Sequence, residues 1–317
     1  MNTRITTLGY LANTDYGWYQ HFLRREPPAE EVNFWRPSDT RAFKVIVPGA
    51  PFFFRLKSPH NAVAGYGFFA RYDPAPAWLA WESFGDLNGT DSLDQMVERL
   101  KKYRKSVGAD VSQDPKSYSI GCIMISHPVW FEERDWVRDD AGWAGNIVNG
   151  KGLELLHGEG QRIFADCLAR TSARAPEAEA VAEGLRHGAP LLVEPRLGQG
   201  TFRIAVTRAY EGACAVTHEH SLPALEAAHV RPFSQGGVHS VSNGLLLRAD
   251  IHRLFDMGYV TVTPDYRFRV SERLMDDFHN GREYLRHGGE LVAVPVNGAD
   301  QPDRELLYWH GTTVFRG

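Results

Sequence analysis

Residues 225–256 read LEAAHVRPFSQGGVHSVSNGLLLRADIHRLFD, and they decide how the carboxyl-terminal part of the chain folds. A short apolar run ends at His229, and a polar loop containing Gly236 and Gly237 follows it. Asn243 opens a second apolar run, and the residues after it have the spacing of a helix. The stretch therefore predicts two short strands joined by a loop, and then a helix.

Two polar residues of the predicted helix, His252 and Asp256, stand four positions apart. Residues at this spacing share one face of a helix, so both side chains can reach a single metal ion. Asp250 lies two positions before His252 and points to another side of the helix, which makes it a weaker ligand candidate. A surface ion pair between His252 and Asp256 is the alternative interpretation.

The segments AAHV, NGLLL and DIHRLFD occur together and in this order. Fourteen positions separate His229 from Asn243, and nine separate Asn243 from His252. In these segments and spacings the chain resembles the HNH endonuclease family, which carries a ββα-metal motif. The resemblance implies that two strands and a helix clamp one divalent cation beside the scissile phosphate of DNA.

The resemblance also implies roles for single residues. It makes His229 the general base, and an imidazole suits that role because its pKa lies near the working pH. Asn243 matches the asparagine that ties the loop to the base and keeps the imidazole oriented. His252 is implied both as a catalytic residue and as a metal ligand, with Asp256 as a second ligand.

The chain departs from the family at one position. In colicin-type members the residue before the base is also a metal ligand, whereas this chain has Ala228 there. Water and a DNA phosphate oxygen would then complete the coordination. Such an open, oxygen-rich sphere suits Mg²⁺ or Mn²⁺, and the imidazole also admits Ni²⁺, Co²⁺ or Zn²⁺.

Four arginines are candidates for contact with DNA phosphates, namely Arg203, Arg231, Arg248 and Arg253. The planar guanidinium of arginine can donate two parallel hydrogen bonds to a phosphate. Arg203 belongs to the run GQGTFR, which recurs in the HNH family. For Arg248 and Arg253, which flank the predicted helix, plain solvation is an equal alternative.

A second metal cluster is suggested by Cys214 with His218 and His220. Many HNH relatives bind a structural zinc through two CxxC pairs, but this chain has no CxxC, and no second cysteine stands near Cys214. We therefore favour a buried cysteine in a turn.

The amino-terminal half, on the run from Val32 to Tyr72, resembles modules of the PUA superfamily, including EVE, ASCH and SRA-like domains. The resemblance implies a small barrel that accepts a flipped or modified base in an aromatic pocket. A flipped base needs stacking surfaces and hydrogen bonds to its edge. For any one aromatic residue, burial in the core is the alternative. The pocket candidates are Trp35, Tyr66, Asn33 and Ser58.

These patterns predict an α+β fold with a PUA-like β-barrel module at 1–150, a helical connector at 151–198 and a ββα-metal HNH nuclease domain at 199–317. Strands are expected at residues 43–47, 52–56, 63–72 and 119–126. Helices are expected at residues 92–103, 159–169, 177–185 and 272–284, and residues 201–210 fit either a helix or a strand.

The chain has 317 residues and a net charge of -4, from 35 basic and 39 acidic residues. This balance excludes nucleic-acid binding through overall charge, so a DNA partner requires a local basic patch. No apolar run reaches the ~18 residues of a membrane span. The 3 cysteines are far apart in sequence and form no disulfide framework, which fits a reducing cytoplasm.

Together the two resemblances predict a modification-dependent HNH restriction endonuclease that cuts double-stranded DNA carrying 5-methyl or 5-hydroxymethyl cytosine. A ββα-metal site cuts one strand, so a double-strand break implies a homodimer or two encounters. Two alternatives stay open: an HNH nuclease that reads unmodified sequence, and a catalytically weak reader of modified nucleic acid, which Ala228 motivates. An RNA target is a further alternative because PUA-like domains also occur on RNA proteins.

Overall fold

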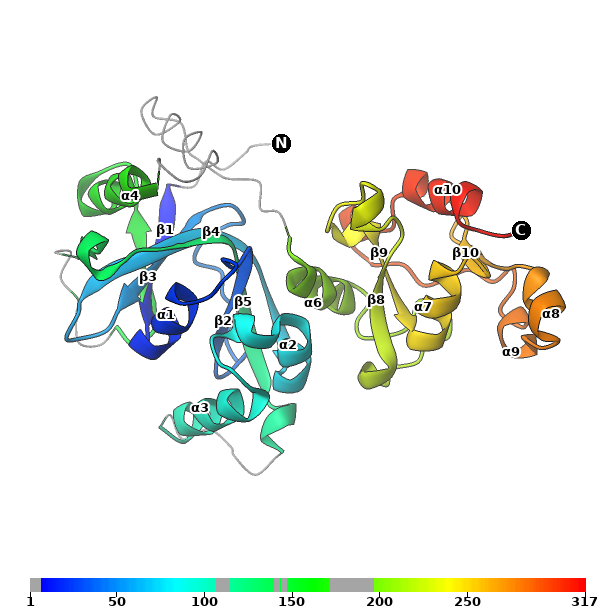
Figure 1. Cartoon of the computed structure of the whole chain (residues 1–317), viewed down its shortest axis with the longest axis horizontal. Coiled ribbons are helices and arrows are strands. Elements are labelled where there is room, and N and C mark those ends of the chain that lie inside the picture. The colour runs from blue at the N-terminus through cyan, green and yellow to red at the C-terminus, as the bar shows by residue number, and fades with distance from the viewer. Residues whose placement is uncertain (1–6, 107–113, 140–142, 144–146, 172–196) are drawn as a thin grey trace. The chain divides into compact units, whose positions relative to one another are not determined.

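The computed structural model describes residues 7–106, 114–139, 143, 147–171 and 197–317. The chain divides into two compact units, Met1–Gly198 and Gln199–Gly317 (Figure 1). The second unit begins at the residue where we expected the nuclease domain to begin. No helix among the described residues combines the length and the apolar character that a membrane span needs. The helix expected at 177–185 lies outside the described residues.

The amino-terminal unit is built on one seven-stranded sheet with the order β2-β5-β4-β3-β1-β7, in which β6 also pairs with β4. β1 and β3 run parallel, and the other paired strands of this sheet run antiparallel. Among the described residues no ladder joins the end strands β2 and β7. The strands are β1 (Leu8–Thr14), β2 (Glu31–Arg36), β3 (Pro51–Leu56), β4 (Ala62–Pro76), β5 (Ser119–Trp130), β6 (Val137–Arg138) and β7 (Gly150–Glu154).

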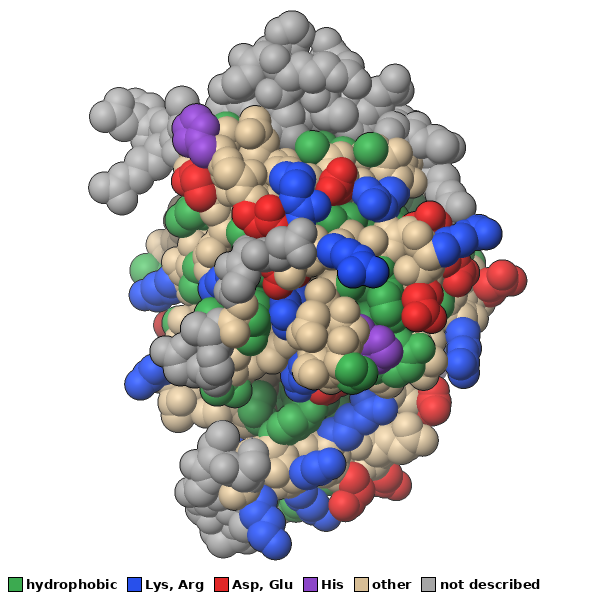
Figure 2. All heavy atoms as spheres, turned by 90° about the vertical axis from the view of Figure 1, so that its left-hand side faces the viewer, with side chains coloured by type: hydrophobic (Ala, Val, Ile, Leu, Met, Phe, Trp, Pro, Cys, Tyr) green, Lys and Arg blue, Asp and Glu red, His purple; other side chains and the backbone are tan. Residues whose placement is uncertain are grey.

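Helices complete this unit and confirm its mixed α and β character. Ser92 caps α3 as expected, because its hydroxyl accepts a hydrogen bond from the Gln95 backbone N–H at 3.3 Å. Both acidic and basic side chains cover the face seen in Figure 2, in keeping with the small net charge. The helices are α1 (Tyr16–Leu23), α2 (Ala77–Phe84), α3 (Leu93–Ser106) and α4 (Gly158–Thr171).

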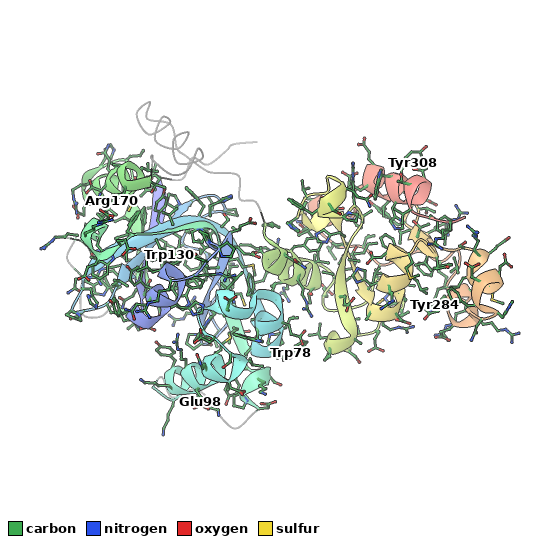
Figure 3. All side chains as sticks on the ribbon, in the orientation of Figure 1. Trp78, Glu98, Trp130, Arg170, Tyr284 and Tyr308 are labelled. Atoms are coloured by element: carbon green, nitrogen blue, oxygen red, sulfur yellow. The ribbon has the colours of Figure 1, made fainter. Side chains whose placement is uncertain are left out.

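Alternating phenylalanines of β3 supply both faces of the sheet. Phe53 packs in one hydrophobic cluster with Phe164 of α4. Its neighbours Phe52 and Phe54 point the other way, into a second cluster. Trp130, labelled in Figure 3, stacks on Phe54 in that second cluster at a ring-centroid distance of 4.5 Å. The aromatic richness of this unit therefore serves its core to a large extent.

The strand expected at residues 43–47 is absent, and a loop takes its place. Phe43 and Ile46 are buried, whereas Val45 and Val47 are exposed, so burial does not alternate here as it would in a strand. In addition, β3 already pairs with β4 on one side and with β1 on the other. The segment before β3 therefore cannot pair with it, and the prediction of a strand was wrong.

Two elements of the amino-terminal unit fall inside the residues 151–198 that we expected to be a connector. β7 pairs antiparallel with β1 across the expected boundary at Gly150. α4 contributes Ile163, Phe164 and Cys167 to the core of the sheet. The sequence pattern predicted α4 as a helix, but its apolar face packs on the first unit.

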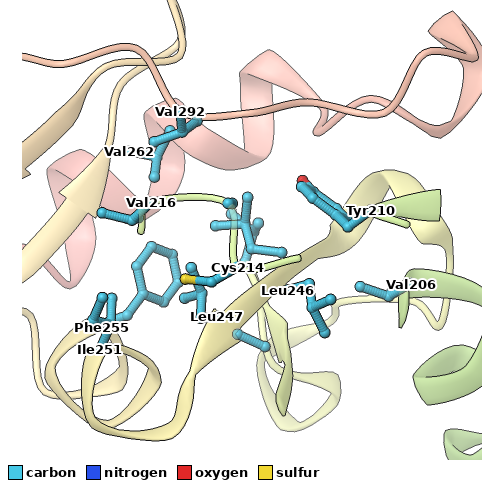
Figure 4. Packing of buried hydrophobic residues seen from close by; sticks show 14 of the residues in the cluster. Val206, Tyr210, Cys214, Val216, Leu246, Leu247, Ile251, Phe255, Val262 and Val292 are labelled. Atoms are coloured by element: carbon cyan, nitrogen blue, oxygen red, sulfur yellow. The ribbon is translucent and has the colours of Figure 1, made fainter. Parts of the chain in front are cut away.

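The carboxyl-terminal unit combines two small hairpins with short helices. Its core gathers Ile251, Phe255, Leu246 and Leu247 around the buried Cys214 (Figure 4). Residues 201–210, which fitted a helix or a strand, lie almost wholly in α6. The elements are α6 (Gln199–Ala209), β8 (Leu225–His229), β9 (Gly244–Arg248), α7 (Ala249–Asp256), β10 (Val260–Val262), β11 (Phe268–Val270), α8 (Arg273–Phe278), α9 (Arg282–Leu285) and α10 (Arg304–Thr313).

The single helix expected at 272–284 is two short helices, α8 and α9. His279 and Gly281 have positive φ angles of 53° and 118°, which no α-helix accommodates. The Asn-Gly pair at 280–281 is a turn signal that outweighed the helical spacing of the apolar residues.

Candidate functional site

The candidate site is built on β8, β9 and α7. The two strands pair antiparallel, with His229 opposite Gly244. At Gly244 a Cβ atom would lie 2.5 Å from Val206 Cγ2 of α6, so only glycine fits there. α7 follows β9 directly and buries Ile251 and Phe255, one turn apart, in the core. The observed succession is the strand, strand and helix that the sequence predicted.

His229 lies at the end of β8 with its ring held from two sides. The ring stacks on Phe202 of α6, with centroids 3.8 Å apart and planes inclined by 12°. Its Nε2 lies 2.9 Å from Nδ1 of His239, in the loop between the strands. Burial, together with the charges of the nearby His239 and His252, lowers the pKa of His229 to about 4. The imidazole is therefore neutral at neutral pH and able to accept a proton.

Asn243 is completely buried in the turn directly before β9, and its side chain holds the backbone of the loop. Its Oδ1 accepts a hydrogen bond from the Arg231 N–H, and its Nδ2 donates to the carbonyls of Arg231 and Val238, each at 2.9 Å. These bonds fix the chain on both sides of the loop, next to His229 and next to His239. Asn243 thus acts on the backbone that carries the imidazoles, while the ring of His229 is held by Phe202 and His239.

His252 lies on the accessible face of α7 between two carboxylates. Its Nδ1 is 2.6 Å from Oε2 of Glu226 on β8. Its Nε2 is 3.4 Å from Oδ2 of Asp256, one helical turn further on. Burial raises the pKa of Asp256 and the charge of Glu226 adds to this, whereas His252 lowers it. The expected neighbours His252 and Asp256 do meet, and Glu226 joins them.

A metal ion beside His252 would be bound by few protein side chains. Among the described residues, no group of three or more His, Cys, Asp or Glu side chains is arranged to hold a metal ion. His252 Nε2 and Asp256 nevertheless offer one imidazole nitrogen and one carboxylate oxygen side by side. This pair fits a divalent cation that takes its other ligands from water and substrate.

Two residues of the site, Glu226 and His239, were missed in the sequence. Glu226 stands two positions before Ala228, so both lie on the same side of the strand, and the resemblance to colicin-type members had directed attention to position 228 as a ligand position. That relation was a usable signal. His239 gave no such signal, because only the folded loop brings it to His229.

The four candidate arginines have different surroundings. Arg248 makes two hydrogen bonds to Asp250, at 2.7 and 2.8 Å, and the Tyr284 hydroxyl (Figure 3) donates to the same carboxylate. Arg231 donates to the Gln235 carbonyl, and Arg203 is half-buried on α6. Arg253 is exposed on α7, next to His252 in sequence. Arg253 is thus the best placed of the four for a phosphate.

The four residues proposed for a base pocket do not share one pocket. Asn33 and Trp35 both donate hydrogen bonds to Asn88, at 2.9 and 3.0 Å. Tyr66 is buried in the cluster around Phe53 and Phe164, where burial raises its pKa to about 12. Tyr66 pairs with Val129 of β5, whereas Trp35 pairs with Cys122, which lies seven positions or about 23 Å away along the same strand. Ser58 lies in an exposed turn.

Cys214 belongs to the core, as we favoured over a metal cluster. It is fully buried, and its Sγ accepts a hydrogen bond from the Arg248 N–H at 3.3 Å. His218 and His220 are exposed. Cys122 and Cys167 of the other unit are likewise buried thiols without a disulfide.

Comparison with known families decides what the site belongs to. Residues 214–263 match the family model of HNH endonucleases. This segment is an HNH endonuclease domain. The match spans His229, Asn243, His252 and Asp256, and it confirms the nuclease class that the motif spacing predicted. No curated protein matches the chain in sequence.

Solved structures show weaker similarities. Two mutant forms of the ZmASCH protein from Zymomonas mobilis align with 49% of this chain and with 94% and 92% of their own, at 8% and 9% identity and a TM-score of 0.30. The modification dependent TagI restriction endonuclease aligns with 95% of this chain and 79% of its own, at 12% identity and a TM-score of 0.26. TM-scores this low establish no function, so the role of the HNH domain rests on its own geometry.

Proposed function

We propose that this protein is a metal-dependent endonuclease that hydrolyses phosphodiester bonds of double-stranded DNA. The observation that carries the proposal is that one hairpin and the helix after it bring His229 close enough to His252 for the charge of His252 to lower the pKa of His229, while His252 lies beside Asp256. Hydrolysis of a phosphodiester needs a base for water and a positive charge beside the phosphate. The two halves of the site match these two requirements.

His229 is the proposed general base. The lowered pKa keeps its ring neutral and its lone pair open to a proton from the attacking water, although it lies below the working pH that we expected and makes the ring a weaker base. Phe202 and His239 hold the ring in one orientation, and Asn243 fixes the backbone on either side. A base that is fixed in this way loses little orientational freedom on the way to the transition state.

HNH endonucleases generally use a divalent metal ion, and His252 with Asp256 would hold it here, with Mg²⁺ or Mn²⁺ as the proposed ion. When bound, the cation would supply positive charge to the phosphate as negative charge develops there. Arg253 would contact a neighbouring phosphate from the same helix.

The amino-terminal unit is proposed to select DNA with modified cytosine, 5-methyl or 5-hydroxymethyl. In support, the HNH chemistry acts on phosphates and carries no base specificity, so a separate unit must supply it. The unit is compact in its own right, and Trp35 of its end strand β2 is only half-buried. Cutting both strands would require a homodimer or two encounters.

Cleavage of plasmid DNA, prepared from methylating and from non-methylating hosts, tests both parts of the proposal in Mg²⁺ and in Mn²⁺. The variant His229→Ala should lose about 10²- to 10⁴-fold in cleavage rate while still binding DNA. The matched control His220→Ala, an exposed histidine of the same unit, should cut like wild type. Wild-type cleavage by His229→Ala would refute the active site. Equal cleavage of both plasmids would remove only the modified-base preference and favour a nuclease that reads unmodified sequence.

A further inference from the structure

We infer that Glu226 is a positioning residue for the metal site: it holds the ring of His252 so that Nε2 faces the cation shared with Asp256. The inference rests on the proposed metal-dependent function, and it assigns a role to a residue outside the predicted set.

The two ring nitrogens of His252 lie at different distances from their neighbouring carboxylates. Nδ1 and Glu226 Oε2 are 2.6 Å apart, which is the separation of a short, charge-assisted N–H···O hydrogen bond. Nε2 and Asp256 Oδ2 are 3.4 Å apart, which is longer than a good hydrogen bond. Two ligands that each lie about 2.1 Å from one cation are about 3.0–3.4 Å apart for bond angles between 90° and tetrahedral. The wider side of the ring therefore has the spacing of a ligand pair, and the narrow side has that of a hydrogen bond.

The fold keeps Glu226 in this position. It lies on β8 opposite Leu247 of β9, and β9 leads directly into the helix that carries His252. The pairing of β8 with β9 thus fixes the backbone position of Glu226 relative to the helix that carries His252. A carboxylate on the far nitrogen of a metal-bound histidine fixes the tautomer and increases the basicity of the ligating nitrogen. With Nδ1 protonated against Glu226, Nε2 keeps its lone pair for the metal.

The first test measures the tautomer of His252 by ¹⁵N NMR in the metal-free full-length chain at one neutral pH. We expect Nδ1–H in the wild type and in Glu226→Gln, whose amide oxygen still accepts the hydrogen bond. In Glu226→Ala we expect a mixture of tautomers. The matched control is Glu290→Gln, because Glu290 contacts Nδ1 of His287 at 3.0 Å in the same unit but outside the site. An unchanged tautomer in Glu226→Ala would overturn the inference.

The second test measures Mn²⁺ affinity by titration calorimetry, with circular dichroism to confirm folding of each variant. We expect Glu226→Ala to bind Mn²⁺ about 10- to 100-fold more weakly, Glu226→Gln to recover most of the loss, and Glu290→Gln to match wild type. If Gln loses as much affinity as Ala, Glu226 is itself a ligand and the positioning role is wrong. A wild type that neither binds Mn²⁺ nor cuts DNA defeats the proposed function, whereas the tautomer result stands on its own.

Discussion

The sheet of the amino-terminal unit and the hairpin of the HNH domain place their polar side chains in different ways. In the sheet unit, Asn33 and Trp35 bond to the buried Asn88 and so tie one element to another. In the HNH domain, His229 and His252 remain partly accessible and lie near other titratable groups. The polar side chains named in the sheet unit connect its elements to one another, whereas the titratable side chains of the candidate site lie close together. The predictions below test that contrast in order of expected effect.

Tyr66 tests whether the aromatic residues of the sheet unit are core or pocket. Replacing Tyr66 by Ala should destabilise that unit by roughly 3–5 kcal/mol, because a large, fully buried ring is lost. Tyr66→Phe keeps the ring and should cost far less. Urea unfolding measures both variants. A Tyr66→Ala chain that is as stable as wild type, but blind to modified cytosine, would restore Tyr66 as a pocket residue.

His310 tests how the burial of a histidine sets the acid stability of the carboxyl-terminal unit. Burial lowers its pKa to about 4 from an ordinary 6.5, and its ring bonds to Thr261 and to the Phe255 carbonyl. Below pH 6.5 the unfolded chain therefore binds a proton that the folded chain does not. The contribution of buried, neutral His310 to stability is fully present above pH 6.5. As the pH drops towards 4, the free energy of unfolding should fall by about 3 kcal/mol.

Thermal unfolding of the full chain at several pH values between 7 and 4 measures this effect. The variant His310→Gln, which cannot take up a proton, should show a flatter dependence on pH even if it is less stable at pH 7. A wild type that is equally stable at pH 7 and pH 4.5 would contradict the assigned pKa.

Asn243 tests whether the loop backbone positions the catalytic imidazoles. Asn243→Ala leaves the Arg231 N–H and two carbonyls without their partner, which should cost about 2 kcal/mol of stability. Cleavage should fall even at temperatures where the variant is fully folded. The control Asn280→Ala removes an exposed asparagine and should change neither quantity. Full activity in folded Asn243→Ala would show that Phe202 and His239 suffice to hold His229.

The smallest expected effect concerns the proposed phosphate contacts, and a comparison of Arg253 with Arg248 tests it. Arg253→Ala should weaken DNA binding several-fold. The slope of the logarithm of the binding constant against the logarithm of the salt concentration should become less steep by about one, because one phosphate contact is lost. Arg248→Ala should have a smaller effect because Arg248 is already engaged by Asp250. Fluorescence anisotropy of a labelled duplex over a range of salt concentrations measures both. Equal losses would mean that the Arg248–Asp250 pair opens on DNA.

Much of the HNH site could be predicted, because its residues obey short-range spacing. His252 and Asp256 are neighbours on any helix, and Asn243 directly precedes the second strand of the hairpin. Glu226 and His239 depend on the register of that hairpin and on the course of its loop, which no local pattern contains. They were therefore missed until the fold was known.

The sheet unit was less predictable for a different physical reason. An aromatic side chain in a strand looks the same in sequence whether it faces a core or a ligand, as Tyr66 shows. The loop at 43–47 has apolar residues typical of a strand, but both edges of the strand that follows it, β3, are already paired. Whether a ring faces the core, and whether a segment pairs as a strand, depends on the strands and helices that surround it in the folded unit.

The three cysteines, all buried and unbridged, make the chain convenient for site-specific labelling. Thiolates are the reactive form, and burial raises the pKa of Cys122 to about 12 and raises that of Cys167 as well. A maleimide dye should therefore bypass the native thiols in the folded chain. One cysteine introduced at the exposed position of His220 could then carry a single fluorophore, and energy transfer to a dye on the duplex would follow DNA docking in real time.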